Sequence, residues 1–444
     1  MKNKITHPVL IIWFAIIALL FLSSVTLPVI PFLNHYKKID ILQDIETVKQ
    51  PLLIVKKLQL ANKKDSVKVA VADVFDSSLI NDYADSPAGM MSNFYKKLNA
   101  LKSSKGKVRI AYFGDSFIEG DYITGQLRDK LQNIYGGNGI GFIPMQSVIA
   151  DTYPFIRFDN NTSWTDYNYH NNPQKYALGL MGHVFYSTGN SWSQYAVVNN
   201  KFKNIDLFTG KTPDSTSVVT LTVVKDGREE KVSINNGSFV NKTVLNNGTP
   251  VNKLKIQCAD KTLPVYGISI EDSTGVYIDN YAFRGNTGLL ALQLQPRIMK
   301  SFGDYFNYDL IIVHYGLNAL VHNDTNYQWF SRGMYKLIEK IRASYPNTPI
   351  LLVSTSDVAY YNQGKYTTDP GVPVLVRTQN EIAKKNKTAF WNLYYAMGGE
   401  NTIANWAEGD TAYAYKDYMH VNAKGASKVA GIFLDKLLVS AKKN

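Results

Sequence analysis

The stretch RIAYFGDSFIEGD, from Arg109 to Asp121, places a serine just after a predicted buried strand. Residues Lys107 to Phe113 are mostly apolar, and an apolar run of this length is typical of a strand inside a sheet. The following segment, Tyr122 to Tyr135, has apolar residues at helical spacing and ends at Gly136-Gly137. We therefore expect Ser116 in a strand-to-helix turn, at the first turn of the helix, where the helix dipole favours negative charge.

Strands and helices alternate again after about residue 277. The pattern predicts a parallel sheet with helices on both of its faces. The strand and helix pairs are VYIDNYAF with TGLLALQLQPRIMKSF, YDLIIVHYG with YQWFSRGMYKLIEKIRASYP, PILLVSTS with PVLVRTQNEIAKKNK, and AFWNLYYAM with AKGASKVAGIFLDKLL. We expect residues 86–145 and 277–444 to form this α/β domain together.

A segment rich in alternating apolar residues, 146–276, interrupts the α/β pattern. It contains SVVTLTVVK, EKVSI, NKLKIQC and PVYGISIED, and Asn-Gly and Asp-Gly turn signals separate several of these runs. Short strands at this spacing predict an all-β sandwich inserted into the α/β domain. An inserted domain carries its own core, so we expect this segment to be separable from the rest of the chain.

The N-terminal segment from His7 to Leu33 contains no formal charge and follows Lys2 and Lys4. Its length suits one membrane-spanning helix, and the preceding lysines favour an N-in orientation with the remaining chain outside the cytoplasm. We predict an uncleaved membrane anchor over 1–33, with a cleaved signal peptide as the alternative. Residues 34–85 mix charge with short apolar runs and are predicted to form a stalk.

Composition excludes several classes of protein. The net charge of +12 is spread along the chain with no dense Lys/Arg block and no nucleic-acid-binding motif, so we predict no nucleic-acid partner. The single cysteine, Cys258, cannot form an intrachain disulfide and is expected to be a small buried residue. The histidines and Cys258 show no metal-ligand spacing, so no metal and no cofactor are predicted.

Reactive side chains follow the predicted strands at the edge where ligands bind in open parallel sheets. Ser116 follows the first strand, RGNTG (Arg284 to Gly288) the second, and HYGLNA (His314 to Ala319) the third. In the last loop, Asp417 precedes His420 by three residues. The sequence therefore brings a hydroxyl, an amide, and an imidazole with a carboxylate to one edge.

Each of these groups has a role in acyl transfer. His420 can remove the proton of the Ser116 hydroxyl, and Asp417 can fix the tautomer and orientation of the imidazole. The backbone N–H groups of Ser116 and Gly288 and the side-chain amide of Asn318 can stabilise the oxyanion.

The blocks FGDSFIEGD, GNTG, GLNA and DYMHVNAKG together resemble those of the SGNH (GDSL-type) hydrolases. The resemblance implies a three-layer α/β/α domain with a flavodoxin-like parallel sheet. It also implies Ser116 as nucleophile, His420 as base, Asp417 as its partner, and Gly288 and Asn318 as oxyanion donors. Gly285 is the alternative to Gly288. The third block departs from the common G-x-N-D form because Ala319 stands where Asp is frequent.

An inserted β-sandwich behind an N-terminal membrane segment resembles the peptidoglycan O-acetylesterases and periplasmic O-acetyltransferases. In those proteins the insert is similar to a carbohydrate-binding module. By this resemblance, Trp164, Tyr167, Tyr169 and Trp192 could stack on sugar rings, or they could simply pack in the core of the insert.

The sequence thus predicts an extracytoplasmic serine esterase, held at the inner membrane, that removes acetyl groups from a cell-wall glycan such as peptidoglycan. One alternative is an O-acetyltransferase that uses the same site on a cell-envelope polysaccharide. A glycan-binding or assembly protein with a degenerate pocket is a third.

Overall fold

The computed structural model describes residues 79–86, 89–147, 153, 156–198, 203–214, 216 and 218–443. The predicted membrane anchor, 1–33, and residues 34–78 of the predicted stalk lie outside the described residues. Within the described ranges, no helix combines the length and the apolar character that crossing a membrane requires.

Five parallel strands and one short antiparallel strand form the central sheet. The parallel strands are β2 (Lys107–Gly114), β14 (Gly275–Ala282), β15 (Leu310–His314), β16 (Ile350–Val353) and β19 (Ala389–Trp391). Their spatial order, β14-β2-β15-β16-β19, is the flavodoxin-like order 2-1-3-4-5 and agrees with the predicted fold class. The edge strand β1 (Asn81–Asp82) pairs with β19, although its residues were predicted as stalk.

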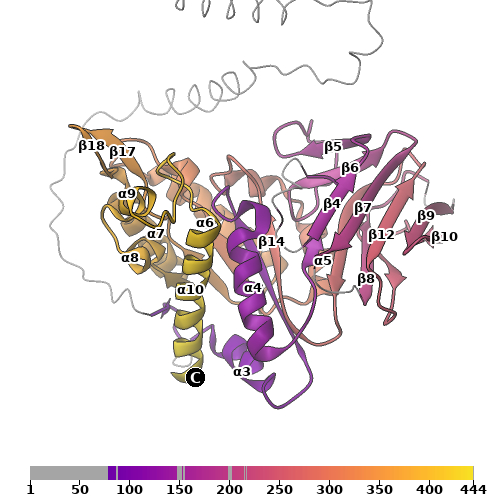
Figure 1. Cartoon of the computed structure of the whole chain (residues 1–444), viewed down its shortest axis with the longest axis horizontal. Coiled ribbons are helices and arrows are strands. Elements are labelled where there is room, and N and C mark those ends of the chain that lie inside the picture. Colours follow the sequence, from indigo (N-terminus) through magenta and orange to yellow (C-terminus); the bar gives the residue numbers. More distant parts are fainter. Residues whose placement is uncertain are drawn as a thin grey trace, which may run out of the picture. The chain divides into compact units, whose positions relative to one another are not determined.

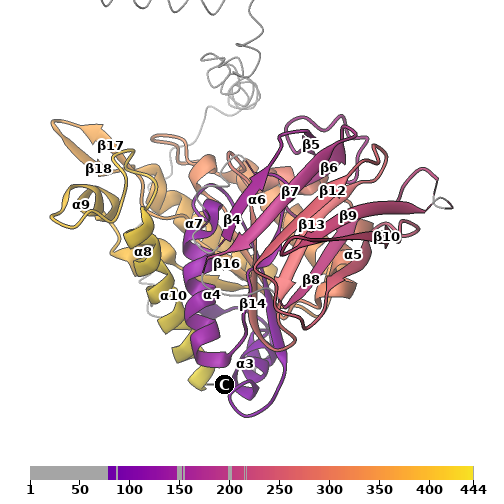
Figure 2. The ribbon, with the colours of Figure 1, turned by 45° about the vertical axis from the view of Figure 1, so that its right-hand side comes forward.

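Helices cover both faces of this sheet. The apolar side chains of β2 lie on both faces and alternate between two cores. Val108, Ile110 and Tyr112 share one core with α3 (Ser92–Ala100), α4 (Tyr122–Tyr135), α8 (Leu393–Met397), α9 (Thr402–Glu408) and α10 (Ala423–Lys443). Ala111 and Phe113 share the other with α5 (Pro296–Phe306), α6 (Gln328–Ser344) and α7 (Gly371–Asn386). Figures 1 and 2 show α4 and α10 side by side on their face.

Two antiparallel sheets pack against each other in the segment between α4 and β14. One has the order β10-β9-β12-β7-β4 and the other β11-β8-β13-β6-β5, with β3 also paired to β13. The strands are β3 (Gly141–Ile143), β4 (Ile156–Asn160), β5 (Trp164–Asn168), β6 (His183–Ser187), β7 (Ser191–Val197), β8 (Asn204–Thr209), β9 (Val219–Lys225), β10 (Arg228–Ile234), β11 (Asn241–Asn246), β12 (Lys253–Cys258) and β13 (Val265–Glu271).

The limits of this sandwich differ from 146 and 276. Strand β3 already pairs with β13 at Gly141–Ile143, and β14 joins the central sheet from Gly275 onward. The Asp-Gly signal at Asp226-Gly227 does form the turn between β9 and β10, because both residues have the positive φ that such a turn requires.

The sandwich shares a core with the α/β layers. Phe142 of β3, Phe208 of β8 and Tyr266 of β13 pack in one cluster with Phe302 and Phe306 of α5. Figure 1 shows α5 beside the sandwich strands. The described residues from both parts belong to one compact unit, Phe75–Asn444. The two parts thus bury apolar surface against each other, and the separability of the insert stays a prediction.

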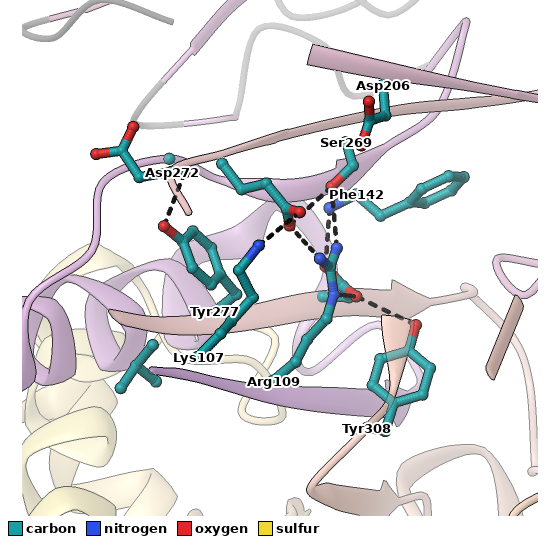
Figure 3. Close-up of polar contacts among 12 residues, drawn as sticks. Lys107, Arg109, Phe142, Asp206, Ser269, Asp272, Tyr277 and Tyr308 are labelled. Atoms are coloured by element: carbon teal, nitrogen blue, oxygen red, sulfur yellow. Dashed lines mark hydrogen bonds and ion pairs between the residues drawn. The ribbon is translucent and has the colours of Figure 1, made fainter. Parts of the chain in front are cut away.

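Arg109 joins the two parts through buried charges (Figure 3). Arg109 belongs to β2, and its guanidinium donates to both carboxylate oxygens of Asp279 in β14, at 2.7 and 2.9 Å. It also donates to Glu271 and, at 3.0 Å, to the hydroxyl of Ser269, both in β13 of the sandwich. The Asp279 carboxylate in turn accepts the Phe142 backbone N–H at 2.8 Å.

Some elements near the carboxyl ends of the strands were not predicted. A hairpin of β17 (Ala359–Asn362) and β18 (Lys365–Thr368) follows β16, and helices α8 and α9 follow β19. Figure 1 shows this hairpin close to α9.

Candidate active site

Three strands of the central sheet end level with one another at the candidate site. Gly114 of β2 pairs with Ala282 of β14 on one side and with His314 of β15 on the other. A side chain at Gly114 would place its Cβ 2.9 Å from the His314 carbonyl oxygen, so the close approach of the strands requires glycine here. The residues that follow each strand therefore emerge at one edge, where the strand order reverses around β2.

Ser116 lies in the loop that follows β2, partly exposed. The prediction that Ser116 lies at the first turn of a helix is wrong, because α4 begins only at Tyr122. A short 3-10 turn, η2 (Glu119–Asp121), stands between them, and Gly120 and Asp121 have φ of 74° and 62° that turn the chain. Since the field of a helix dipole falls off within its first turn, the dipole of α4 does not act on the Ser116 hydroxyl.

Ser116, His420 and Asp417 form a continuous hydrogen-bonded chain. The Ser116 Oγ lies 2.8 Å from His420 Nε2, and His420 Nδ1 lies 2.7 Å from Asp417 Oδ2. These residues are up to 304 positions apart in the sequence, and the fold brings them together at the carboxyl edge of the sheet. The arrangement lets His420 take a proton from Ser116 while Asp417 holds the imidazole in the required tautomer.

The turn that carries Asp417 and His420 is held by its own backbone. The other oxygen of Asp417 accepts the N–H groups of Met419 and His420, both at 3.0 Å. Partial burial raises the pKa of Asp417, but these N–H groups and the His420 side chain outweigh it and hold the pKa below its usual range. Asp417 is therefore ionised at neutral pH and can stabilise a protonated His420.

Of the three predicted oxyanion donors, the Ser116 backbone N–H has no acceptor among the described residues, and the other two are placed differently. Asn318 is exposed in the turn η5 (Leu317–Ala319) after β15, and its side-chain amide lies 3.4 Å from the Asn286 carbonyl oxygen. The N–H of Gly288 is buried and already donates to the Asn286 side chain at 2.7 Å. The Gly288 N–H is therefore not free to donate to an oxyanion in this structure.

Gly285 is better placed than Gly288 to donate a backbone N–H. It is exposed, has φ of 72°, and its N–H has no acceptor among the described residues. The N–H of Phe283, two residues before Gly285, donates to the Gly114 carbonyl at 3.0 Å and connects this loop to the end of β2. Gly285, with no described acceptor for its N–H, and the side-chain amide of Asn318 are therefore the candidate oxyanion donors.

Asp115, next to Ser116, was not singled out by the sequence. Its carboxylate is 1% exposed and accepts the N–H groups of Phe117 at 3.0 Å and Gly316 at 3.3 Å. Burial raises the pKa of Asp115 to about 6, although these N–H groups act in the opposite direction. The Asp115 side chain thus joins the Ser116 loop to the loop that carries Asn318. In the sequence, only its place in the Gly-Asp-Ser motif pointed to Asp115.

Other residues considered from the sequence lie away from this chemistry. His314 is buried against Tyr112 and Phe117, and burial lowers its pKa to about 3. Cys258 is buried, as expected, and burial raises the pKa of its thiol to about 12. Over the described part of the chain, no group of three or more His, Cys, Asp or Glu side chains is arranged to hold a metal ion.

The four aromatic residues considered for sugar stacking have separate outcomes. Trp164 and Tyr169 are 5% and 6% exposed and belong to the packed interior. Trp192 is partly buried beneath the Lys255 ammonium, 4.2 Å from the ring centroid. Tyr167 lines an open groove.

Comparisons with known proteins give one family match and several similar solved structures. Residues 256–428 match the GDSL-like Lipase/Acylhydrolase family. A solved structure of a peptidoglycan O-acetylesterase is similar at a TM-score of 0.69 and 24% identity, over 82% of this chain and 99% of that one. A family two carbohydrate esterase from Clostridium thermocellum, in complex with cellohexaose, has a TM-score of 0.28 and 10% identity, over 64% of this chain and 98% of that one. No curated protein sequence matches the chain.

The resemblance to the SGNH (GDSL-type) hydrolases is therefore confirmed, and the α/β domain has their fold. The family match supports an acyl hydrolase that acts on esters.

Proposed function

We propose that the chain is a serine esterase that removes O-acetyl groups from a cell-wall glycan such as peptidoglycan. The observation that carries the proposal is the hydrogen-bonded chain from Ser116 through His420 to Asp417. The family match and the similarity to a peptidoglycan O-acetylesterase support the choice of ester and substrate.

The geometry suits a two-step acyl transfer. The Ser116 Oγ attacks the acetyl carbonyl carbon while His420 Nε2 takes the hydroxyl proton. The carbonyl oxygen becomes an oxyanion that accepts hydrogen bonds from the Asn318 amide and the Gly285 N–H. Collapse of this intermediate breaks the ester bond, and His420 returns the proton to the sugar oxygen that leaves. Water, activated by His420, then releases acetate from Ser116.

An assay with a chromogenic acetate ester tests the proposal on the purified full-length chain. We expect release of acetate from the ester and from O-acetylated peptidoglycan. Ser116→Ala should lower kcat by at least about a thousandfold with little change in melting temperature, because Ser116 is partly exposed and its hydroxyl bonds only His420 among the described residues. Turnover near that of the starting chain in Ser116→Ala would refute a serine mechanism.

The same assay separates the esterase from the alternative acetyltransferase. With a glycan acceptor present, an esterase yields free acetate, whereas a transferase yields acetylated glycan. Neither product would support a binding protein with a degenerate pocket.

We further propose that this esterase works outside the cytoplasm, with 1–33 as its anchor in the inner membrane. The uncharged span behind Lys2 and Lys4 supports this location. A reporter fused after Asn444 should be active only when it is exported, and activity of a reporter that functions only in the cytoplasm would contradict the proposal.

A further inference from the structure

A large groove lies on the sandwich, lined by residues other than Ser116, His420 and Asp417. Its volume is about 700 Å³, within the range of ligand-binding clefts. Strands β5 and β6, the loop between them, the segments around β8 and β13, and the start of α5 all contribute to its walls. The groove therefore lies where the sandwich meets the α/β layers.

Three tyrosines form one wall of the groove. The rings of Tyr167 and Tyr176 are stacked with their centroids 4.0 Å apart, and Tyr186 lies 5.1 Å from Tyr176. All three are partly exposed and line the groove. Because the rings hold one another in place, they present a rigid aromatic surface, which suits the apolar face of a sugar ring.

Four basic residues also line the groove, together with apolar and hydroxyl side chains, and none of the described acidic residues does. Lys175, Lys211, Lys261 and Arg297 are exposed, and none of them forms an ion pair with a described carboxylate. Arg297 is held over the ring of Phe239, 4.4 Å from its centroid, and is braced by Gln295 at 2.8 Å. Four uncompensated positive charges around one groove favour an anionic occupant.

One loop connects this groove to the candidate active site. Lys175 and Tyr176, in the loop between β5 and β6, line the groove. His170 in the same loop lies against Phe283, 5.1 Å between ring centroids, and a Cβ at Gly285 would lie 4.0 Å from its Nε2. In Figures 1 and 2, β5 and β6 lie toward the end of the molecule opposite α3.

We propose that this groove binds a carboxylate-bearing segment of the glycan whose acetyl groups Ser116 removes. The inference rests on the proposed function for its choice of a glycan. Stacked tyrosines suit sugar rings, and arginine and lysine side chains suit carboxylates, with arginine able to bind them in bidentate geometry. An anionic lipid surface would use the charges but would leave the recessed tyrosine stack without a role.

Binding to soluble peptidoglycan fragments tests the proposal. The fragments carry carboxylates on their peptides, and the matched ligand is the same material with its carboxylates converted to methyl esters. Isothermal titration with the full-length chain should give at least about tenfold weaker binding for the methyl esters, and the difference should shrink at high salt. Equal affinity for both ligands would overturn the proposal.

Variants of the groove add a second arm. The double variant Lys175→Gln/Arg297→Gln should weaken fragment binding at least about tenfold, whereas Lys300→Gln should not. Lys300 lies on α5 like Arg297 and is exposed, but it does not line the groove. Melting temperatures of all variants report whether the fold is kept. Binding by the double variant equal to that of Lys300→Gln would overturn the proposal, as would binding to phosphatidylglycerol vesicles in place of fragments.

The design distinguishes failure of this inference from failure of the proposed function. If Ser116→Ala binds fragments as the starting chain does while neither releases acetate, the groove stands and the esterase does not. If acetate is released but methyl esterification leaves binding unchanged, the esterase stands and the groove does not.

Discussion

Replacement of Arg109 by methionine should destabilise the whole described unit. Methionine keeps an apolar stem of similar length but removes the guanidinium from between Asp279, which is buried with 0% exposure, and Glu271, whose side chain is 13% exposed. Removing one partner of a buried ion pair costs about 3–5 kcal/mol, because the remaining charge stays buried without compensation. We therefore expect the free energy of unfolding to fall by that amount.

The matched control is Lys107→Met, which also removes a cation from Glu271. The Lys107 ammonium binds Glu271 at 2.8 Å, but its side chain is 31% exposed. Ion pairs with a solvent-exposed partner contribute about 0–1 kcal/mol, so this variant should lose at most that much. The comparison isolates the effect of burial from the effect of charge alone.

Urea unfolding of both variants provides the measurement. With a denaturant slope of about 3 kcal/mol per M, Arg109→Met should lower the urea midpoint by about 1–1.7 M, and Lys107→Met by about 0.3 M at most. The thiol of Cys258, buried in the sandwich, and small-ester turnover at Ser116 report on the two parts separately, and both signals should change at the same urea concentration. Equal midpoints for the two variants would refute the reasoning from the buried charges.

The site and the shared core allow four further tests. Asn318→Ala should lower kcat by about a hundredfold to a thousandfold at an unchanged melting temperature, since it removes an exposed oxyanion donor. Gly288→Ala should instead lower the melting temperature, because its Cβ would lie 2.9 Å from the Tyr315 ring at a φ of 94°; the reverse pattern would contradict the assignment. A pKa of about 6 for Asp115, against 3.8 ordinarily, means that the folded chain binds this proton more tightly than the unfolded chain, so its contribution to stability is lost as pH rises through 6. The stability of the starting chain relative to Asp115→Asn should therefore fall by about 1.4 kcal/mol from pH 5 to pH 8 in urea unfolding, and a constant difference would show that Asp115 does not titrate there. Replacement of residues 141–274 by a short Gly/Ser linker should leave no soluble protein that melts cooperatively, because the shared core is lost. A folded remainder that still turns over a small ester would show that the shared core is dispensable.

Local pattern was sufficient for the elements that place the candidate triad. The apolar run of β2 and the helical spacing of α4 follow from neighbouring residues, so their existence was predictable, as was the edge at which Ser116 lies. The start of α4 was not, because the turn at Gly120 and Asp121 depends on positive φ angles that apolar spacing does not report.

Long-range contacts explain what the sequence did not show. Arg109 looks like an ordinary charged residue at the start of a strand, and its partner Glu271 lies 162 positions away. The choice between Gly285 and Gly288 depends on the Asn286 side chain, which occupies the N–H of Gly288. For the β17–β18 hairpin, the one local signal in the sequence was Gly364, which forms the turn with Gln363, both at positive φ.

The shared core has a consequence for how a long polymer meets this molecule. The sandwich and the central sheet are packed together and joined by the ion pairs of Arg109. The groove lined by Tyr167, Tyr176 and Tyr186 therefore keeps a constant distance from Ser116. A polymer long enough to reach both sites would, while bound in the groove, present its ester groups to Ser116 at a high effective concentration. A short fragment could occupy only the groove or only the Ser116 site, so binding in the groove would not help its reaction. If the chain deacetylates a glycan as proposed, the rate should rise sharply once the glycan is long enough to reach from the groove to Ser116.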